Sequence, residues 1–166
     1  MFFVNDTQEQ RHKFIRSFLN RDTAPIAILL AAIDFEWTVK RAILAFGTSP
    51  TKNLRACFRN VYGLHRSKEK WKEEVQPRLG CSIDRAIRQW SQVHDAFEIR
   101  DKIIHGASVP VTLEHATPHV NSILAASESL EKLAKEKDRS LYQRRIRRQN
   151  QWSRIGEPIT QQEPES

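Results

Sequence analysis

The chain has 166 residues, a length typical of one compact domain that buries its own hydrophobic core. Lysine and arginine number 27 against 20 acidic residues, and the net charge of +7 favours polyanionic partners, namely RNA, DNA or an anionic membrane surface. The longest uncharged apolar run, residues 24–33, is far shorter than the roughly 20 residues of a membrane-spanning helix, so we expect a core helix there and no membrane segment.

The start of the chain and its cysteines indicate a compartment. The N-terminus, MFFVNDTQEQRHK, lacks the basic and then apolar order of a signal peptide, which favours a cytoplasmic protein. Cys57 and Cys81 are too few for a disulfide framework and fit no metal-ligand spacing. We expect two ordinary free thiols whose role is to pack against other side chains.

Five glycines and seven prolines leave room for long helices, and no internal repeat is visible. We predict an all-α fold, an antiparallel bundle of four to five main helices. This helical domain is expected over residues 1–140, followed by a basic helical extension over 141–155. The final residues, 156–166, have the polar composition of a disordered tail.

The first predicted elements are two helices. An amphipathic helix is expected over residues 7–20, because apolar side chains recur there at helical spacing. The second starts at Thr23, with Pro25 in its first turn, and ends at Gly47. Its apolar residues cover almost every side, which is typical of a central buried helix.

The middle of the chain is less regular. A third helix is expected to start at Ser49 and Pro50 and to end near Gly63, with one apolar face. This face consists of Leu54, Cys57, Phe58, Val61 and Tyr62. Residues 64–80 are rich in charge, which predicts a connection with a short helix around Trp71.

A fourth, long helix is predicted to start at Ser82 and to end at His105, with a buried apolar stripe. The stripe consists of Ile83, Ile87, Trp90, Phe97 and Ile104. After Gly106 we expect an irregular stretch. A last helix should open at residues 117–118 and extend toward the basic run at 142–154.

Four polar residues lie on one side of the fourth predicted helix: His94, Glu98, Asp101 and His105. Two alternatives are open for these residues. They form an edge of the protein that faces water, or they line a groove. A metal site is a third alternative, but a di-iron bundle needs Glu-x-x-His on two helices, and this pairing is absent. We therefore expect no metal and no cofactor.

The sequence RDKIIHG, residues 100–106, brings two chemically distinct groups to the end of this helix. Asp101, four residues before His105, can accept from the imidazole, and the helix end also favours a protonated ring, which suits proton transfer. Arg100 matches phosphate oxygens; its alternative role is a salt bridge, for example to Glu36. Arg100 and His105 are about 140° apart on an ideal helix, so they converge only through side-chain reach or a loosened last turn.

The order of Arg100, Asp101, three residues, His105 and a small residue, at the end of a long helix in a small all-α protein, resembles the HEPN domain superfamily. The resemblance covers the helical body, about residues 7–138. Glu36 and Lys40, on the second helix, are similar to the charged helix that some members place near the motif, and we expect them to support it.

This resemblance implies a metal-independent endoribonuclease with a composite site across a homodimer, found in the family as toxins and as phage-defence effectors. His105 would be the general acid or base, Arg100 the binder of the phosphate and transition state, and Asp101 the group that orients His105. Cleavage through a 2′-hydroxyl needs one group to take a proton and another to give one, which two copies of His105 supply. An antitoxin or regulatory protein is a further expected partner. Some toxins carry a modified tyrosine two residues after the histidine, where this chain has Ala107.

Basic residues extend the expected RNA-binding surface, as phosphate contacts interleaved with the aromatic Tyr142 and Trp152. They are Lys102, Arg144, Arg145, Arg147 and Arg148. The arginine segment has a simpler alternative as a solvated helix end. For the whole chain, the alternatives are a non-catalytic HEPN-like module that binds RNA, a nucleotide or a protein, and a small basic DNA-binding regulator.

Overall fold

A computed structural model describes residues 6–106, 110–143 and 146, and these residues form helices and connections without a β-strand. The elements are α1 (Gln8–Arg16), α2 (Ala24–Phe46), α3 (Thr51–Cys57), the 3-10 helix η1 (Phe58–Asn60), α4 (Gly63–Glu74), α5 (Gln76–Leu79), α6 (Ile83–Ala86), α7 (Trp90–Ile104) and α8 (Leu113–Lys135). The all-α prediction is confirmed. Among the described helices, none combines the length and apolar character that crossing a membrane requires.

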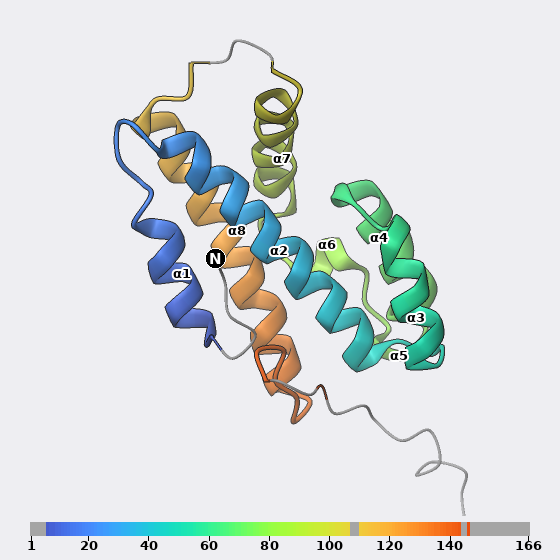
Figure 1. Cartoon of the computed structure of the whole chain (residues 1–166). Helices are drawn as coiled ribbons and strands as arrows, with labels where there is room; N and C mark the ends of the chain where they lie inside the picture. Colours follow the sequence, from blue (N-terminus) through green and yellow to red (C-terminus); the bar gives the residue numbers. More distant parts are fainter. Residues whose placement is uncertain (1–5, 107–109, 144–145, 147–166) are drawn as a thin grey trace, which may run out of the picture.

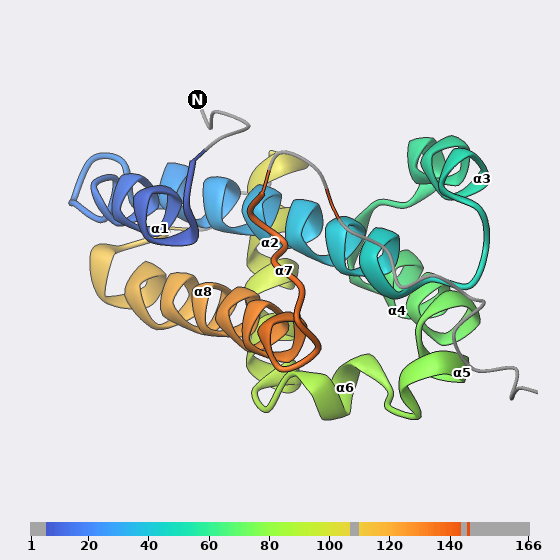
Figure 2. The same cartoon turned by 90° about the horizontal axis from the view of Figure 1, so that it is seen from below.

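The two long helices, α2 and α8, lie side by side and run in the same direction (Figures 1 and 2). The shorter α1 runs the opposite way, α7 crosses α2 and α8 at a steep angle (Figure 2), and α4 packs against the C-terminal half of α2. Antiparallel packing, expected for the whole bundle, therefore describes the α1–α2 pair and not the central α2–α8 pair. A chain that joins two parallel helices must return between them, and α7 provides this return.

Helix α2 begins and ends as the sequence predicts. Thr23 is its N-cap and Gly47 its C-cap, and a proline occupies the first turn. Its buried alanines, among them Ala27, Ala31 and Ala42, are fully inaccessible and let neighbouring helices approach closely. An alanine at Gly47 would place its Cβ 2.5 Å from the Ile43 carbonyl oxygen, so only glycine fits there.

Residues 64–80 differ from the prediction, because α4 is a helix of 12 residues rather than a connection with a short helix. Leu64, Ser67 and Trp71 recur at spacings of three and four and form its buried side. The Trp71 ring is fully buried, and its Nε1 donates to the Cys81 carbonyl over 3.0 Å. Charged residues fill the other sides of α4 and hid this short apolar stripe from sequence inspection.

The predicted fourth helix is two helices. α6 ends at Ala86, the next residue, Ile87, has an extended backbone (φ −117°, ψ 105°), and α7 begins at Trp90. Ile87 is buried all the same, so the apolar spacing continues across the break and periodicity did not reveal it. Ile104, placed in the buried stripe, is instead exposed.

Three further boundaries also differ. α1 ends at Arg16 instead of residue 20, and the third helix gives way to η1 after Cys57. α8 starts earlier than predicted, because Thr112 is its N-cap and accepts from the His115 backbone N–H over 3.3 Å. Pro118 consequently lies inside α8 rather than at its start.

The basic helical extension expected over 141–155 is not helical in the residues that the structure describes, 141–143 and 146. α8 ends at Lys135, and Asp138 has a positive φ of 54°. The Arg41 guanidinium then donates to the carbonyls of Leu141 and Gln143, which fixes this segment on α2.

A buried polar cluster, which we name the Asp34 cluster, joins α1, α2 and the segment after α8. The Asp34 carboxylate lies 3.2 Å from Arg11 Nη1 and 3.7 Å from His12 Nε2. The Tyr142 hydroxyl lies 2.9 Å from Thr38 Oγ1 and 3.5 Å from Asp34 Oδ2. Burial raises the pKa of Tyr142, and the Asp34 charge raises it further, so the phenol stays protonated.

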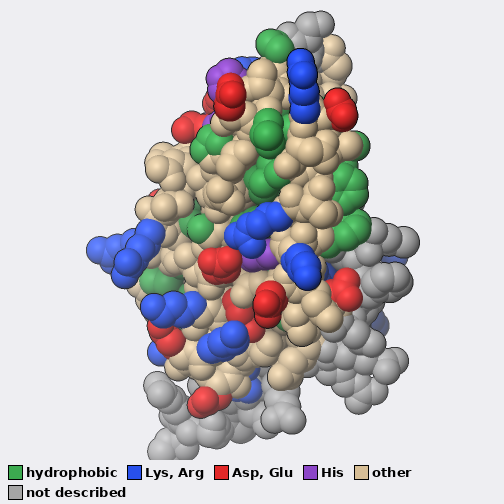
Figure 3. All heavy atoms as spheres, turned by 90° about the vertical axis from the view of Figure 1, so that its left-hand side faces the viewer, with side chains coloured by type: hydrophobic (Ala, Val, Ile, Leu, Met, Phe, Trp, Pro, Cys, Tyr) green, Lys and Arg blue, Asp and Glu red, His purple; other side chains and the backbone are tan. Residues whose placement is uncertain are grey.

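On the side of the molecule that carries α1, acidic and basic side chains alternate over the surface, and hydrophobic side chains gather in the upper half (Figure 3). The lysine and arginine side chains on this face do not form one continuous basic patch. This face therefore offers no broad surface for a polyanion.

Replacing Asp34 should destabilise the fold strongly. In Asp34→Asn, the charge of the buried Asp34 carboxylate that pairs with Arg11 is lost, and we expect the free energy of unfolding to fall by about 3 kcal/mol in urea denaturation. Asp84→Asn is the control, because the Asp84–Lys68 pair is solvent-exposed and should contribute only about 0–1 kcal/mol. Equal losses in the two variants would contradict this account.

Glu74 at the end of α4 holds the turn that follows α2. Its carboxylate accepts from the Ser49 backbone N–H (2.9 Å), the Ser49 hydroxyl (2.8 Å) and the Thr48 hydroxyl (3.1 Å). Burial alone would raise its pKa, but these hydrogen bonds and the nearby Lys70 outweigh burial and lower the pKa.

This lowered pKa predicts acid sensitivity. The folded protein holds Glu74 ionised more strongly than the unfolded chain does, so this stability is present above about pH 4.5 and is lost as the pH falls through the folded-state pKa. Glu74→Gln should lower stability at pH 7 and flatten its decline between pH 5 and 3, measured by denaturation at each pH. Glu73→Gln, on the exposed side of α4, should retain the wild-type slope.

Candidate active site

Helix α7 ends where the sequence predicts. His105 is its C-cap, and its backbone N–H donates to the Asp101 carbonyl over 2.9 Å. Gly106 follows with a φ of 72°, a left-handed conformation that favours glycine. The His105 side chain is exposed at this helix end.

Arg100 points from α7 toward α2. Its Nη2 lies 3.5 Å from Glu36 Oε1, and its Nη1 lies 2.7 Å from Asp101 Oδ1. The salt bridge to Glu36, expected as the alternative role of Arg100, is therefore present. The arginine side chain remains 21% exposed.

Glu36 connects three helices at this point. Its Oε1 also accepts from the backbone N–H of Gly63, the first residue of α4, over 3.0 Å. One turn along α2, Lys40 Nζ lies 4.7 Å from the centre of the Tyr62 ring. Glu36 thus contacts the motif through Arg100, and Lys40 contacts Tyr62 beside the start of α4.

Tyr62 is a second residue, after Ile104, that the sequence prediction placed wrongly. It was assigned to the buried face of the third helix, but its side chain is 62% exposed beside Lys40. The prediction from helical spacing was wrong because the backbone is extended at Tyr62, just before α4 begins. A glycine at position 63, with a φ of 72°, was the available signal for this change of direction.

The four polar residues along α7 face solvent. His94 and Glu98 form an exposed pair at 3.6 Å, and Asp101 is exposed as well. This arrangement agrees with the solvated-edge alternative. Within the described residues, no group of three or more His, Cys, Asp or Glu side chains is arranged to hold a metal ion.

The structure does not join Asp101 to His105 through their side chains. The Asp101 carboxylate pairs with Arg100 instead, and in the described part of the chain no hydrogen bond or ion pair reaches the His105 ring. Arg100 faces α2 while His105 sits at the exposed C-cap, so one chain does not bring the two groups together. Lys102 is exposed on α7; Arg144, Arg145, Arg147 and Arg148 lie outside the described residues.

Comparison with protein-family models, with curated proteins and with solved structures gives no match to this chain.

Two replacements should separate the contributions of Glu36. Glu36→Gln keeps an oxygen that accepts from the Gly63 N–H and loses only the charge, so we expect a loss of less than about 1 kcal/mol in the free energy of unfolding. Glu36→Ala removes both contacts and should cost about 1–3 kcal/mol. Urea denaturation measures both, and an equal loss would show that the hydrogen bond to α4 contributes nothing.

Proposed function

We propose that the protein is a metal-independent endoribonuclease of HEPN type that acts as a homodimer. The observation that carries this proposal is the end of α7, where an accessible arginine held by Glu36 and an exposed histidine at a helix end occur in one short motif. The all-helical fold supports it. The net positive charge of the chain suits an RNA substrate.

The reaction needs groups that the motif supplies. A 2′-hydroxyl attacks the neighbouring phosphorus as a base removes its proton, the phosphorane forms, and the leaving 5′-oxygen receives a proton from an acid. His105 suits either proton transfer, and Arg100 would stabilise the charge on the phosphorane. Asp101, paired with Arg100, would orient the guanidinium in this single chain.

A second copy would complete the site. One chain has one motif histidine, and its ring has no hydrogen bond or ion pair with the arginine, whereas a two-fold dimer would bring two of each into one cleft. Ile33, one turn before Glu36, and Ile104, one turn after Arg100, are each 52% exposed. Such apolar side chains beside the ion pair suit burial against a partner.

Aromatic and basic groups near the motif would hold the RNA. Tyr62 offers an exposed ring for a base to stack on, with Lys40 beside it for a phosphate. Lys102 and the arginines that follow residue 143 would add phosphate contacts. A cytoplasmic toxin or phage-defence effector, restrained by an antitoxin or other regulatory protein, is the setting that fits such an enzyme.

A non-catalytic HEPN-like module is the second candidate, and the pairing of Arg100 favours it. Two carboxylates, Glu36 and Asp101, already contact its guanidinium and offset its positive charge. Such a module would bind RNA, a nucleotide or a protein through the same surface without cleaving a strand.

The decisive measurement is RNA cleavage by purified protein in excess chelator. We expect the wild type to cleave single-stranded RNA, and His105→Ala or Arg100→Ala each to lower the rate by at least about 100-fold. His94→Ala, which removes another exposed histidine of α7, should retain full activity.

Cleavage undiminished in both folded variants, or no cleavage by the wild type, would refute the nuclease. RNA binding without cleavage would support the non-catalytic module. A chain that stays monomeric at the assay concentration while cleaving RNA would contradict the composite site.

A further inference from the structure

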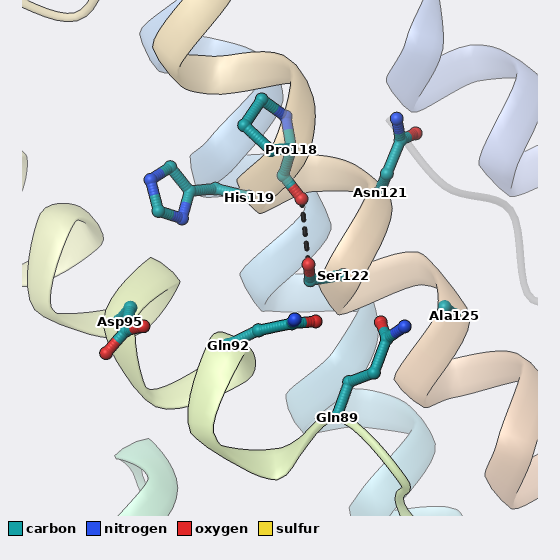
Figure 4. A pocket seen from close by; sticks show the side chains of 8 residues that line it. All are labelled: Gln89, Gln92, Asp95, Pro118, His119, Asn121, Ser122 and Ala125. Atoms are coloured by element: carbon teal, nitrogen blue, oxygen red, sulfur yellow. Dashed lines mark hydrogen bonds between the residues drawn. The ribbon is translucent and has the colours of Figure 1, made fainter.

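A groove between the start of α7 and the first half of α8 lies apart from the motif and has a volume of about 500 Å³. This volume falls within the roughly 300–1,000 Å³ of small-ligand sites. Its polar lining consists of Gln89, Gln92 and Asp95 from the α7 side and His119, Asn121 and Ser122 from α8. Figure 4 shows the two glutamine side chains reaching toward Ser122, with Asp95 and His119 at the other end.

The lining offers hydrogen-bonding groups that the fold does not use. In the described part of the chain, the side-chain amides of Gln89 and Gln92 make no hydrogen bond, although an amide offers both donors and an acceptor. Ser122 is different, because its hydroxyl already donates to the Pro118 carbonyl over 2.8 Å. The groove therefore suits a ligand with several polar groups of its own.

Its charge excludes an anionic ligand. Asp95 is the one side chain among these lining residues with a full charge near neutral pH. Burial lowers the pKa of His119; Asp95 opposes this and His115 adds to it, so the imidazole is mostly neutral at pH 7. A phosphate would meet Asp95 and no cation, so the ligand must present donors to a carboxylate.

The geometry points to an unpaired guanine base of an RNA strand as this ligand, with Asp95 as the residue that selects it; this rests on the proposed endoribonuclease function. Guanine carries two adjacent donors on its Watson–Crick edge, N1–H and the N2 amino group, which one carboxylate accepts together. Adenine, cytosine and uracil each present a single donor group there, beside an acceptor that a carboxylate repels. The amides of Gln89 and Gln92 would donate to guanine O6 and N7.

The position of the groove agrees with a strand that also reaches the motif. Asp95 precedes His105 by ten residues on the same helix, which corresponds to roughly 15 Å along its axis. A smaller apolar pocket of about 210 Å³ shares His119 with the groove, and Ile99, which lies between Asp95 and His105 in the sequence, is part of its lining. A base in the groove would thus lie a few nucleotides from the scissile phosphate.

The test uses the His105→Ala variant, so that RNA stays intact, and short oligouridines that carry one guanosine, inosine or adenosine, or none. We expect the guanosine oligomer to bind about tenfold tighter than oligouridine, and inosine, which lacks the N2 amino group, to bind less tightly than guanosine. Adding Asp95→Asn should abolish the preference for guanosine. Adding Glu98→Gln, which removes the same charge from the exposed side of α7, should leave it intact.

Free guanosine tests the groove separately from the motif. It should shift the NMR signals of the His119 ring in the parent protein, and it should not shift them in Asp95→Asn. Equal affinity for all oligomers, a preference that survives Asp95→Asn, or no RNA binding would each overturn the proposal. Wild-type cleavage assays separate the two ideas. Cleavage without a guanosine preference refutes the groove alone, and a guanosine preference without cleavage refutes the nuclease alone.

Discussion

Two carboxylates on the central helix α2 determine how the other elements assemble. Asp34 is fully buried, and a buried charge must be paired, so it holds Arg11 of α1 and lies near Tyr142, which follows α8. Glu36 projects from the opposite side, where it holds Arg100 of α7 and the first N–H of α4. A helix that is otherwise apolar thereby specifies which neighbour belongs on which side, something that hydrophobic contact alone does loosely.

The Glu36 carboxylate also shapes the proposed site. Glu36 holds Arg100, the group proposed to bind phosphate, in one position, but it also offsets part of the positive charge of the guanidinium. His105 lacks such support, because it sits at the exposed C-cap and the Asp101 carboxylate turns to Arg100. A rigid arginine and an unsupported histidine on diverging sides of α7 are consistent with chemistry that depends on a second copy and an RNA strand to order it.

Sequence reasoning succeeded where one physical signal dominated. Apolar residues on every side of α2, Thr23 before it and Gly47 after it located that helix almost to the residue. It failed where tertiary packing overrode the local pattern. Ile87 stays buried across a break in the helix, and the charges of α4 concealed the stripe that ends at Trp71. Of the candidate site, the pairing of Arg100 with Glu36 could be anticipated from charge, whereas the exposure of Tyr62 required the backbone direction before α4.

The Asp34 cluster also determines the order in which the chain can complete its core. Asp34 meets Arg11 from a segment synthesised before it, but Tyr142 is separated from it by more than a hundred residues. While the ribosome is still making α7 and α8, part of the environment that surrounds the Asp34 charge does not yet exist. Contacts between residues that are this far apart in the sequence form slowly. The central helix can therefore take up its final surroundings only when nearly the whole described chain has emerged, which makes the segment at Leu141 and Tyr142 the closing piece of the fold.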